Sequence, residues 1–593
     1  MQKTTKKSIR MRALLRTTAL IGLMAIAACS QEDNDQNYTS TELSKQTKNV
    51  EALEREETTS NAQKEHKVKK TAGLVLEDSM PLSAMPAPSV APAIAPGYDN
   101  AIAPLPEVAP EIDRENYLHL ADNPVHLTQE DPVSTFSIDV DTGGYSNVRR
   151  FLEDGALPRE DAVRIEELVN YFSYDYPLPE DQAQPFKVFT EVAPTPWNAE
   201  TKLIHIGIKA FDIPAEDRPA ANLVFLVDIS GSMHAQNKLP LLKSSLRLMV
   251  DKMTEKDRIS LVTYAGSTRV VLPATPGNEK AKIRAAIEAL SSGGSTNGGA
   301  GIKLAYAEAQ KELIEGGINR ILLATDGDVN VGTVDFDALK DMVERKRKGG
   351  VSLTTLGFGT GNYNDHLLEQ LADAGNGNHA YIDGLSEARK VLVEEMSSTL
   401  LTVAKDVKIQ VEFNPTVVAE YRLIGYENRV LNREDFNNDK VDAGEIGAGH
   451  TVTALYEVAL VGSEGKQLDP LRYGTKKGNS DTALEKGFSA GDELAYVKVR
   501  YKAPDGDKSK LLAYPIEVAE MKTANEKTDD HFRFSAAVAA FGQILKGGKY
   551  TGDMTMEDVH KLARSGLGED PFGYRREFLG LVDLASSMDV ATR

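Results

Sequence analysis

The chain has 593 residues, of which 41% are hydrophobic, and 88 acidic against 68 basic residues give a formal net charge of −20. This length exceeds what one hydrophobic core supports and predicts about three or four domains. The acidic balance argues against nucleic acid as a partner, because phosphate binding requires a basic surface. It is compatible with a protein that attracts cations or basic partner surfaces.

The amino terminus has the features of a lipoprotein signal peptide. Basic residues between Lys6 and Arg16 precede the apolar run 19–26, as in a secretory leader. The run ends in Ile26-Ala-Ala-Cys29, which resembles a bacterial lipobox and contains the single cysteine of the chain. A lone cysteine at this point fits lipidation better than a disulfide. We expect residues 1–28 to be removed and Cys29 to carry the lipid; the alternative is an ordinary signal peptide.

The lipid predicts where the mature protein lies. Several acyl chains on one residue give stable membrane anchoring. Ser30 and Gln31 follow the cysteine with no Asp beside it, which resembles the sorting pattern of Gram-negative lipoproteins of the outer membrane. No later window reaches the ~18 apolar residues that a membrane helix requires. We therefore expect a protein of the bacterial cell envelope, held at the outer membrane by lipid alone.

The first part of the mature chain has the composition of a tether. Polar residues dominate at first, and Met80-Pro-Leu-Ser-Ala-Met-Pro then alternates proline with small residues. Such a sequence buries too little apolar surface to fold. Residues 29–115 are therefore predicted to be a disordered tether rich in Pro and Ala.

Residues 116–215 are predicted to form an α+β region. The segment 134–141 alternates polar and apolar residues as a half-buried strand does. Asp139 and Asp141 lie on one face of this strand, and we expect them to face solvent. Helical spacing follows over 145–157 and 162–172, and further strands are expected at 189–192 and 203–208.

Between residues 221 and 385, apolar strands alternate with amphipathic helices. This alternation predicts an α/β fold with a doubly wound, mostly parallel sheet of Rossmann type, whose right-handed crossovers bring the loops after the strands to one edge. The strands are expected at 223–227, 258–264, 269–272, 320–325, 351–358 and 380–382. The helices are expected at 239–253, 280–290, 302–313, 336–347 and 367–374.

Oxygen-bearing side chains follow two of these strands. Asp228-Ile-Ser-Gly-Ser232 comes directly after the first apolar run, and Asp326 ends the run Arg320-Ile-Leu-Leu-Ala-Thr325. Thr296 lies in the glycine-rich loop Gly293-Gly-Ser-Thr296. Ligands of open α/β sheets gather at the carboxyl ends of the strands. Carboxylate and hydroxyl oxygens suit Mg²⁺, Mn²⁺ or Ca²⁺ rather than Zn²⁺.

This pattern resembles the metal-ion-dependent adhesion site of the von Willebrand factor type A (VWA) family, which uses Asp-x-Ser-x-Ser, a later Thr and a later Asp. All five positions match, as Asp228, Ser230, Ser232, Thr296 and Asp326. The resemblance implies a VWA fold over 221–385 and a divalent cation, Mg²⁺ or else Mn²⁺ or Ca²⁺, held directly or through water. It also implies an open coordination position that an Asp or Glu of a protein partner completes. The alternative is that these residues simply cap helices.

The remaining chain is predicted to be a helix followed by a β-rich, sandwich-like module over 386–520, and a helical region over 521–593. The first helix is expected at 385–405, the strands at 407–413, 451–460 and 493–501, and the later helices at 533–545, 556–563 and 574–588. Together with residues 134–177, these segments resemble the regions that accompany the VWA domain in bacterial lipoproteins.

These observations predict an envelope lipoprotein that binds a protein partner and is not an enzyme. The alternative is a metal-assisted hydrolase that uses the same ion to activate water. Asp328 is the only further candidate base beside the site. Asp435-Phe-Asn-Asn-Asp439 loosely resembles a Ca²⁺ loop, but Lys440 stands where the sharp turn needs Gly, so we interpret it as a polar turn.

Overall fold

The computed structural model describes residues 114–180, 184–214, 216–327, 329, 336–469 and 492–588, all within the compact unit Glu107–Arg593. The predicted signal peptide, Cys29, nearly all of the predicted tether, and Asp328 lie outside the described residues. Among the described residues, none of the helices has the length and apolar character that crossing a membrane requires.

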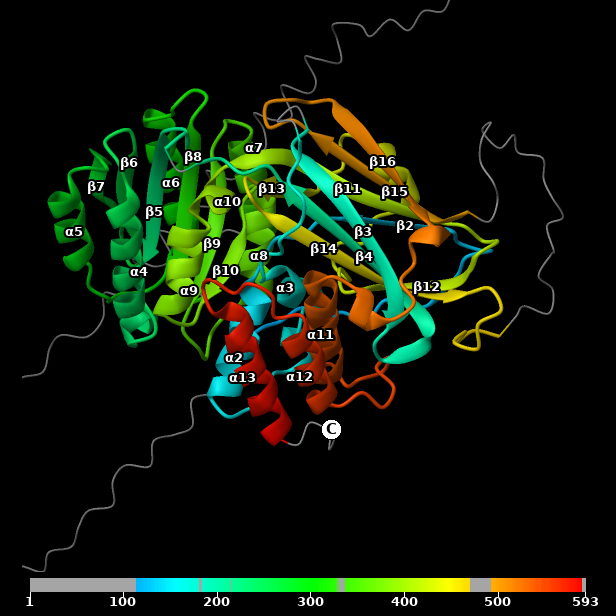
Figure 1. Cartoon of the computed structure of the whole chain (residues 1–593). Helices are drawn as coiled ribbons and strands as arrows, with labels where there is room; N and C mark the ends of the chain where they lie inside the picture. The colour runs from blue at the N-terminus through cyan, green and yellow to red at the C-terminus, as the bar shows by residue number, and fades with distance from the viewer. Residues whose placement is uncertain are drawn as a thin grey trace, which may run out of the picture. The chain divides into compact units, whose positions relative to one another are not determined.

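A six-stranded sheet in the order β10-β9-β8-β5-β6-β7 forms the doubly wound part of the chain (Figure 1). Neighbouring strands are parallel except for the antiparallel pair β6 and β7. The chain leaves β5 for β6 on one side and reaches β8 on the other, so β5 lies at the switch point where ligands of such sheets bind. The bounds are β5 Ala221–Asp228, β6 Arg258–Tyr264, β7 Thr268–Pro276, β8 Ile318–Thr325, β9 Ser352–Phe358 and β10 His379–Ile382.

The side chains of β5 alternate between two apolar cores. Leu223, Phe225 and Val227 belong to the core that includes residues of α4, α5 and α9, whereas Val224 and Leu226 belong to the core that includes residues of α6, α7 and α8. Burial on both faces explains why β5 is a continuous apolar run. The predicted doubly wound sheet is thus confirmed. The helices are α4 Leu239–Lys252, α5 Lys280–Glu288, α6 Gly298–Lys311, α7 Phe336–Arg347, α8 Asp365–Ala374 and α9 Leu385–Arg389.

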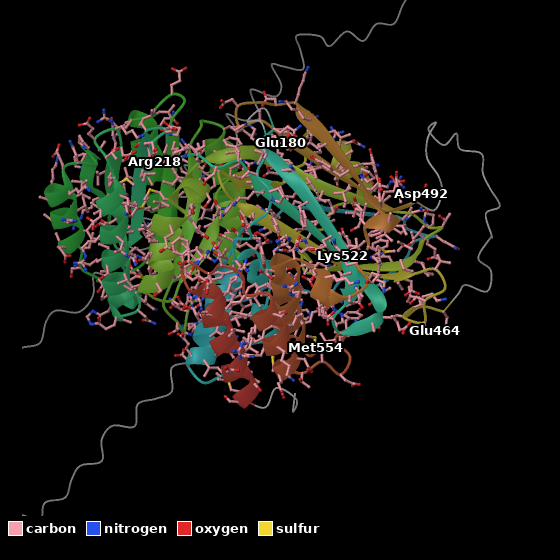
Figure 2. The ribbon with its side chains drawn as sticks, in the orientation of Figure 1. Glu180, Arg218, Glu464, Asp492, Lys522 and Met554 are labelled. Carbon is pink, nitrogen blue, oxygen red and sulfur yellow. The ribbon has the colours of Figure 1, made fainter. Side chains whose placement is uncertain are left out.

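A buried ion pair fixes the start of β5. Arg218, labelled in Figure 2, donates from Nη2 to both carboxylate oxygens of Asp257 at 2.9 Å. Asp257 Oδ1 also accepts from the backbone N of Ala221 at 3.1 Å. Because Asp257 directly precedes β6, this carboxylate links the starts of the neighbouring strands β5 and β6.

Two five-stranded sheets form a sandwich around a shared core. One has the order β1-β12-β14-β4-β3; in the other, β13-β11-β15-β16 follow one another and β2 pairs with β11. The regions predicted at 116–215 and 386–520 both contribute strands to each sheet. The bounds are β1 His126–Leu127, β2 Val133–Ser137, β3 Phe186–Thr195, β4 Asn198–Ala210, β11 Thr402–Phe413, β12 Val418–Ile424, β13 Gly444–Gly447, β14 Thr451–Leu460, β15 Glu493–Lys502 and β16 Ser509–Glu517.

Helices that are far apart in the sequence form a further core, in which α11 contacts α3 and α13 contacts α2 (Figure 1). Arg149 of α2 ties this core to the doubly wound part. Its guanidinium lies 2.6 Å from Asp383, 2.7 Å from Glu387 and 2.7 Å from Glu577 of α13. The bounds are α2 Gly143–Glu153, α3 Ile165–Asn170, α11 Asp530–Leu545, α12 Met556–Ser565 and α13 Tyr574–Ser587.

The helix expected over 385–405 is confirmed as helical turns up to Leu400 and is wrong only at its end, where β11 begins. After α9, a π-helical turn, η3 Lys390–Glu394, and the short α10 Met396–Leu400 follow, and β11 already begins at Thr402. Thr402 pairs with Gly447 and Ala404 with Ile446 of β13. Pairing with a strand that is distant in sequence outweighs the local helical spacing.

The prediction that Asp139 and Asp141 face solvent is also wrong, because each is only 4% exposed. Arg429 Nε donates to Asp139 at 3.0 Å and its Nη2 to Asp141 at 3.2 Å. The same guanidinium reaches Asp373 at 2.7 Å and Glu369 at 3.2 Å, both on α8. A cation about 290 residues away in the sequence permits this burial.

Replacement of Arg429 by Met should lower the free energy of unfolding by about 3–5 kcal/mol, because it leaves buried carboxylates without their cation. Urea denaturation followed by circular dichroism measures this change. Arg284, which pairs with Asp251 and is partly exposed, provides the control, and R284M should cost less than about 1 kcal/mol. Similar small losses in both variants would contradict the assigned role of Arg429.

The contribution of Glu166 and Glu369 to stability should increase as the pH falls from about 8 to about 5.5. Burial raises the pKa of Glu166 to about 7 and that of Glu369 to about 7. An unfolded Glu titrates near ~4.3, so these two groups bind more protons in the folded state between these values and favour it at the lower pH. Buried His205 and His450, whose pKa values burial lowers, contribute with the opposite sign, so the variant E369Q isolates the glutamate contribution. The urea midpoint of the wild type relative to that of E369Q should rise toward low pH, whereas E255Q, at an exposed position, should follow the wild type.

Candidate metal centre

The ends of two neighbouring parallel strands bring two carboxylates to one edge of the sheet. Asp228 is the last residue of β5, and Asp326 directly follows β8; both are 0% exposed. Val227 pairs with Ala324, so Asp228 lies level with Thr325. The Thr325 hydroxyl donates to Asp228 Oδ2 at 3.1 Å. The parallel register therefore brings Asp228 and Asp326, which are far apart in the sequence, into a single site.

The loop after β5 folds its hydroxyls around the first carboxylate. Asp228 Oδ1 accepts from the backbone N of Ser230 at 2.8 Å, which turns the chain back toward the strand end. The hydroxyls of Ser230 and Ser232 are 2.9 Å apart. Ser230 is buried and Ser232 is exposed, so the site has an inner side and a side that faces solvent.

Backbone hydrogen bonds place the loop that contains Thr296 beside this turn. Gly293 N donates to Ile229 O at 2.7 Å, and Gly231 N donates to Gly294 O at 3.0 Å. Gly294 has φ +94°, which other residues rarely adopt. Thr296 follows in the same loop, half-buried, two residues before α6. The structure thus brings the segments of all five predicted ligands together, and their coordination of a metal stays a prediction.

A lysine that the sequence did not indicate completes the electrostatics of the site. Lys238 Nζ donates to Asp326 Oδ2 at 3.0 Å and to Asn362 Oδ1 at 2.8 Å, and its side chain is 8% exposed. A Cβ on Gly359 would lie only 2.3 Å from Lys238 Cγ, so the lysine stem passes where only glycine leaves room. Nothing in the local sequence distinguishes Lys238 from the surface lysines of an amphipathic helix.

The charges of the site favour the binding of a divalent cation, and the site that holds the cation then favours the binding of an anion. Burial raises the pKa of Asp228 to about 6, and nearby Asp326 also raises it, while hydrogen bonds from Ser230 and Thr325 lower it. With both carboxylates ionised, Lys238 leaves one negative charge in excess, and a divalent ion converts this to one positive charge. The oxygen donors fit Mg²⁺, Mn²⁺ or Ca²⁺. A bound ion of this kind would attract a carboxylate.

Within the part of the chain that the structure describes, two other groups of side chains lie close enough together to hold a metal ion: Asp139, Glu167 and Glu369, and Glu191, Asp529 and His531. In the first group, Arg164 donates to Glu369 at 2.8 Å and Arg429 to Asp139 at 3.0 Å. In the second, the backbone N of Asp529 donates to Glu191 at 3.2 Å. These carboxylates already have hydrogen-bond donors of the protein. No spacing in the sequence indicated either group.

Family models match three parts of the chain. The model described as von Willebrand factor type A domain matches residues 222–395, and the model described as von Willebrand factor matches residues 111–205. A third, described as the carboxyl-terminal part of the uncharacterized protein YfbK, matches residues 398–588. The doubly wound sheet and the first match define a VWA-domain protein.

The chain is 49% identical over 478 residues to the uncharacterized protein YfbK of Escherichia coli (strain K12), covering 80% of this chain and 81% of that protein. It belongs to the YfbK family. It is also 27% identical over 262 residues to the human inter-alpha-trypsin inhibitor heavy chain H3, covering 40% of this chain and 28% of that protein. Among solved structures, von Willebrand factor type A from Catenulispora acidiphila shares 16% identity, with a TM-score of 0.36, covering 66% of this chain and 88% of that one.

Replacement of Lys238 by Met tests the charge balance of the site. In EDTA, K238M should lower the free energy of unfolding by about 3 kcal/mol, because Asp326 loses its buried cation. Mg²⁺ should stabilise K238M more than the wild type, since two uncompensated carboxylates attract the ion more strongly. Thermal melts with and without Mg²⁺ measure both effects. Lys252, exposed on the same helix, provides the control K252M; an equal response to Mg²⁺ in all three proteins would contradict the assignment.

Proposed function

We propose that the protein is a lipid-anchored protein of the cell envelope whose VWA domain binds a protein partner through a divalent metal ion. The observation that carries this proposal is the convergence of Asp228, Ser230 and Asp326 at the switch point of the sheet. VWA domains commonly mediate protein–protein interaction, and the family model covers this whole segment.

Asp228, Ser230, Ser232, Thr296 and Asp326 would hold the ion, which is Mg²⁺, Mn²⁺ or Ca²⁺. The exposed side of the site, at Ser232, leaves room for a ligand from outside the chain. An Asp or Glu of the partner is the group expected there, because the loaded site carries an excess positive charge and the ion prefers oxygen. The metal would then be the bridge between the two proteins.

The location is part of the same proposal. Cys29, at the end of the apolar leader, would carry the lipid, and Ser30 and Gln31 favour the outer membrane. The net negative charge of the chain argues against nucleic acid as a partner. A lipid at Cys29, followed by the tether that the sequence predicts over residues 29–115, would let the VWA domain reach partners away from the membrane surface.

Binding accounts for the contacts of the site better than catalysis does. The side chains that contact the two carboxylates include Thr325 and Lys238, which both act as hydrogen-bond donors there. A hydrolase needs a base that accepts a proton from water. His234 lies on the exposed side, 3.4 Å from Ser292 Oγ, and its ring makes no contact with Asp228 or Asp326 that would orient it toward them.

Removal of the first carboxylate tests the proposal. D228A should reduce the affinity for Mn²⁺ at least about a hundredfold, because a buried charged ligand is worth several kcal/mol to a cation. Electron paramagnetic resonance of free Mn²⁺ measures the binding, and D341A, at an exposed position of α7, is the control. Capture of partners from envelope extracts should require Mg²⁺ and fail with D228A. Capture that persists in EDTA would contradict the proposed function.

A further inference from the structure

The first described residues contact the loop that leads into α8. Asn116 and Asn364 form a parallel bridge outside the named strands. We call residues 114–117 the amino-terminal clasp and residues 359–364 the clasp loop. The clasp lies at the start of the described residues and includes the last two residues of the predicted tether.

Backbone hydrogen bonds hold the clasp on the loop. The N–H of Arg114 donates to Gly361 O at 2.9 Å, and the N–H of Asn116 donates to Tyr363 O at 3.0 Å. In the opposite direction, the N–H of Gly361 donates to Glu115 Oε1 at 3.0 Å. The clasp therefore fixes the backbone of the clasp loop from one side.

The other side of the clasp loop contacts the metal centre. Asn362 Oδ1 accepts from Lys238 Nζ at 2.8 Å, and the same ammonium donates to Asp326 at 3.0 Å. Gly327, the residue after Asp326, has φ +95°, and a Cβ there would lie 2.3 Å from the backbone N of Asn364. Both the lysine that neutralises Asp326 and the turn that follows Asp326 are thus positioned by this loop.

Glu115 and Tyr117 attach the clasp to further parts of the fold. Glu115 is buried and its backbone O accepts from Arg159 Nη1 at 3.2 Å, while Tyr117 packs against the core that includes residues of α6, α7 and α8. Glu115 pairs with Arg150 at 2.8 Å, and the Tyr117 hydroxyl donates to Glu115 at 2.7 Å and accepts from Asn147 at 2.9 Å. Arg114 and Asn116 are exposed. A segment that contributes no strand to a sheet can open locally at a free energy below that of global unfolding. The clasp can therefore exist docked or undocked while the core stays folded.

We propose that docking of the clasp and metal binding at Asp228 and Asp326 are coupled. The docked clasp holds Asn362 where it shares the Lys238 ammonium, so that Asp326 keeps lone pairs for a cation. Undocking releases Asn362, and the ammonium then pairs with Asp326 alone and competes with the metal. This inference rests on the proposed function, because it concerns regulation of the same site.

The coupling has a defined size and must act in both directions. Coupling free energies between two sites usually correspond to factors of about 5–150 in affinity. By linkage, the factor by which docking strengthens metal binding equals the factor by which the metal strengthens docking. Mn²⁺ should therefore slow hydrogen exchange at the amides of Asn116 and Gly361 in the wild-type protein.

The decisive experiment removes the two N–H donors of the clasp in the full chain. The double variant R114P/N116P should bind Mn²⁺ about tenfold more weakly than the wild type, within the usual range of coupling. The matched control is A121P, a proline in the same exposed segment beyond the clasp, which should bind as the wild type does. Mn²⁺ titrations followed by electron paramagnetic resonance give the affinities, and circular dichroism verifies that each variant is folded.

A double-mutant cycle with N362A tests the route. N362A should itself weaken Mn²⁺ binding, and the proline pair should then add little, because both changes interrupt the same connection. Equal affinities of R114P/N116P and wild type, unchanged hydrogen exchange on adding Mn²⁺, or full additivity with N362A would each overturn the coupling. A wild-type protein that binds no Mn²⁺ would overturn the proposed function as well, so the two failures are distinguishable.

Discussion

The burial of Asp228 and Asp326 at adjoining strand ends is the constraint around which the VWA domain of this chain is arranged. A carboxylate out of contact with water is costly unless donors or a cation surround it. The chain meets this requirement with the Thr325 hydroxyl, the Ser230 backbone and the ammonium of Lys238. Lys238 can reach Asp326 only because Gly359 lacks a side chain. The same groups leave the site attractive to a metal and, once it is loaded, to an anion.

Buried charge also joins the parts of the molecule to one another. Arg149, Arg164 and Arg429 each contact carboxylates that come from different regions of the chain. Two of these arginines bind Glu369 of α8, the helix that the clasp loop precedes. The sandwich takes strands from before and after the VWA segment, so this domain is an insertion held at both ends. The clasp loop beside the candidate metal centre is consequently in contact with a segment that a free VWA domain would lack.

Residue patterns predicted the helices and strands whose burial follows one periodicity along their whole length. The helix Phe336–Arg347 lies where its apolar spacing indicated, and β5 is the buried strand that its continuous apolar run indicated. The predicted helix 385–405 failed where β11 begins, because the pairing partner of Thr402 lies in β13. Asp139 and Asp141 were misjudged because the cation that buries them, Arg429, belongs to a different part of the sequence.

The fold class and the order of the oxygen-bearing residues follow from the sequence alone, because strand periodicity and the Asp-Ile-Ser-Gly-Ser turn are local properties of the chain. The leader that ends at Cys29 stays a prediction from the sequence. The folded structure was needed to show which charge compensates Asp326, which strands complete the sandwich, and which loop contacts the candidate metal centre. Each of these depends on residues that come into contact through parallel crossovers and long-range strand pairing. Residue spacing along the chain does not predict such long-range contacts.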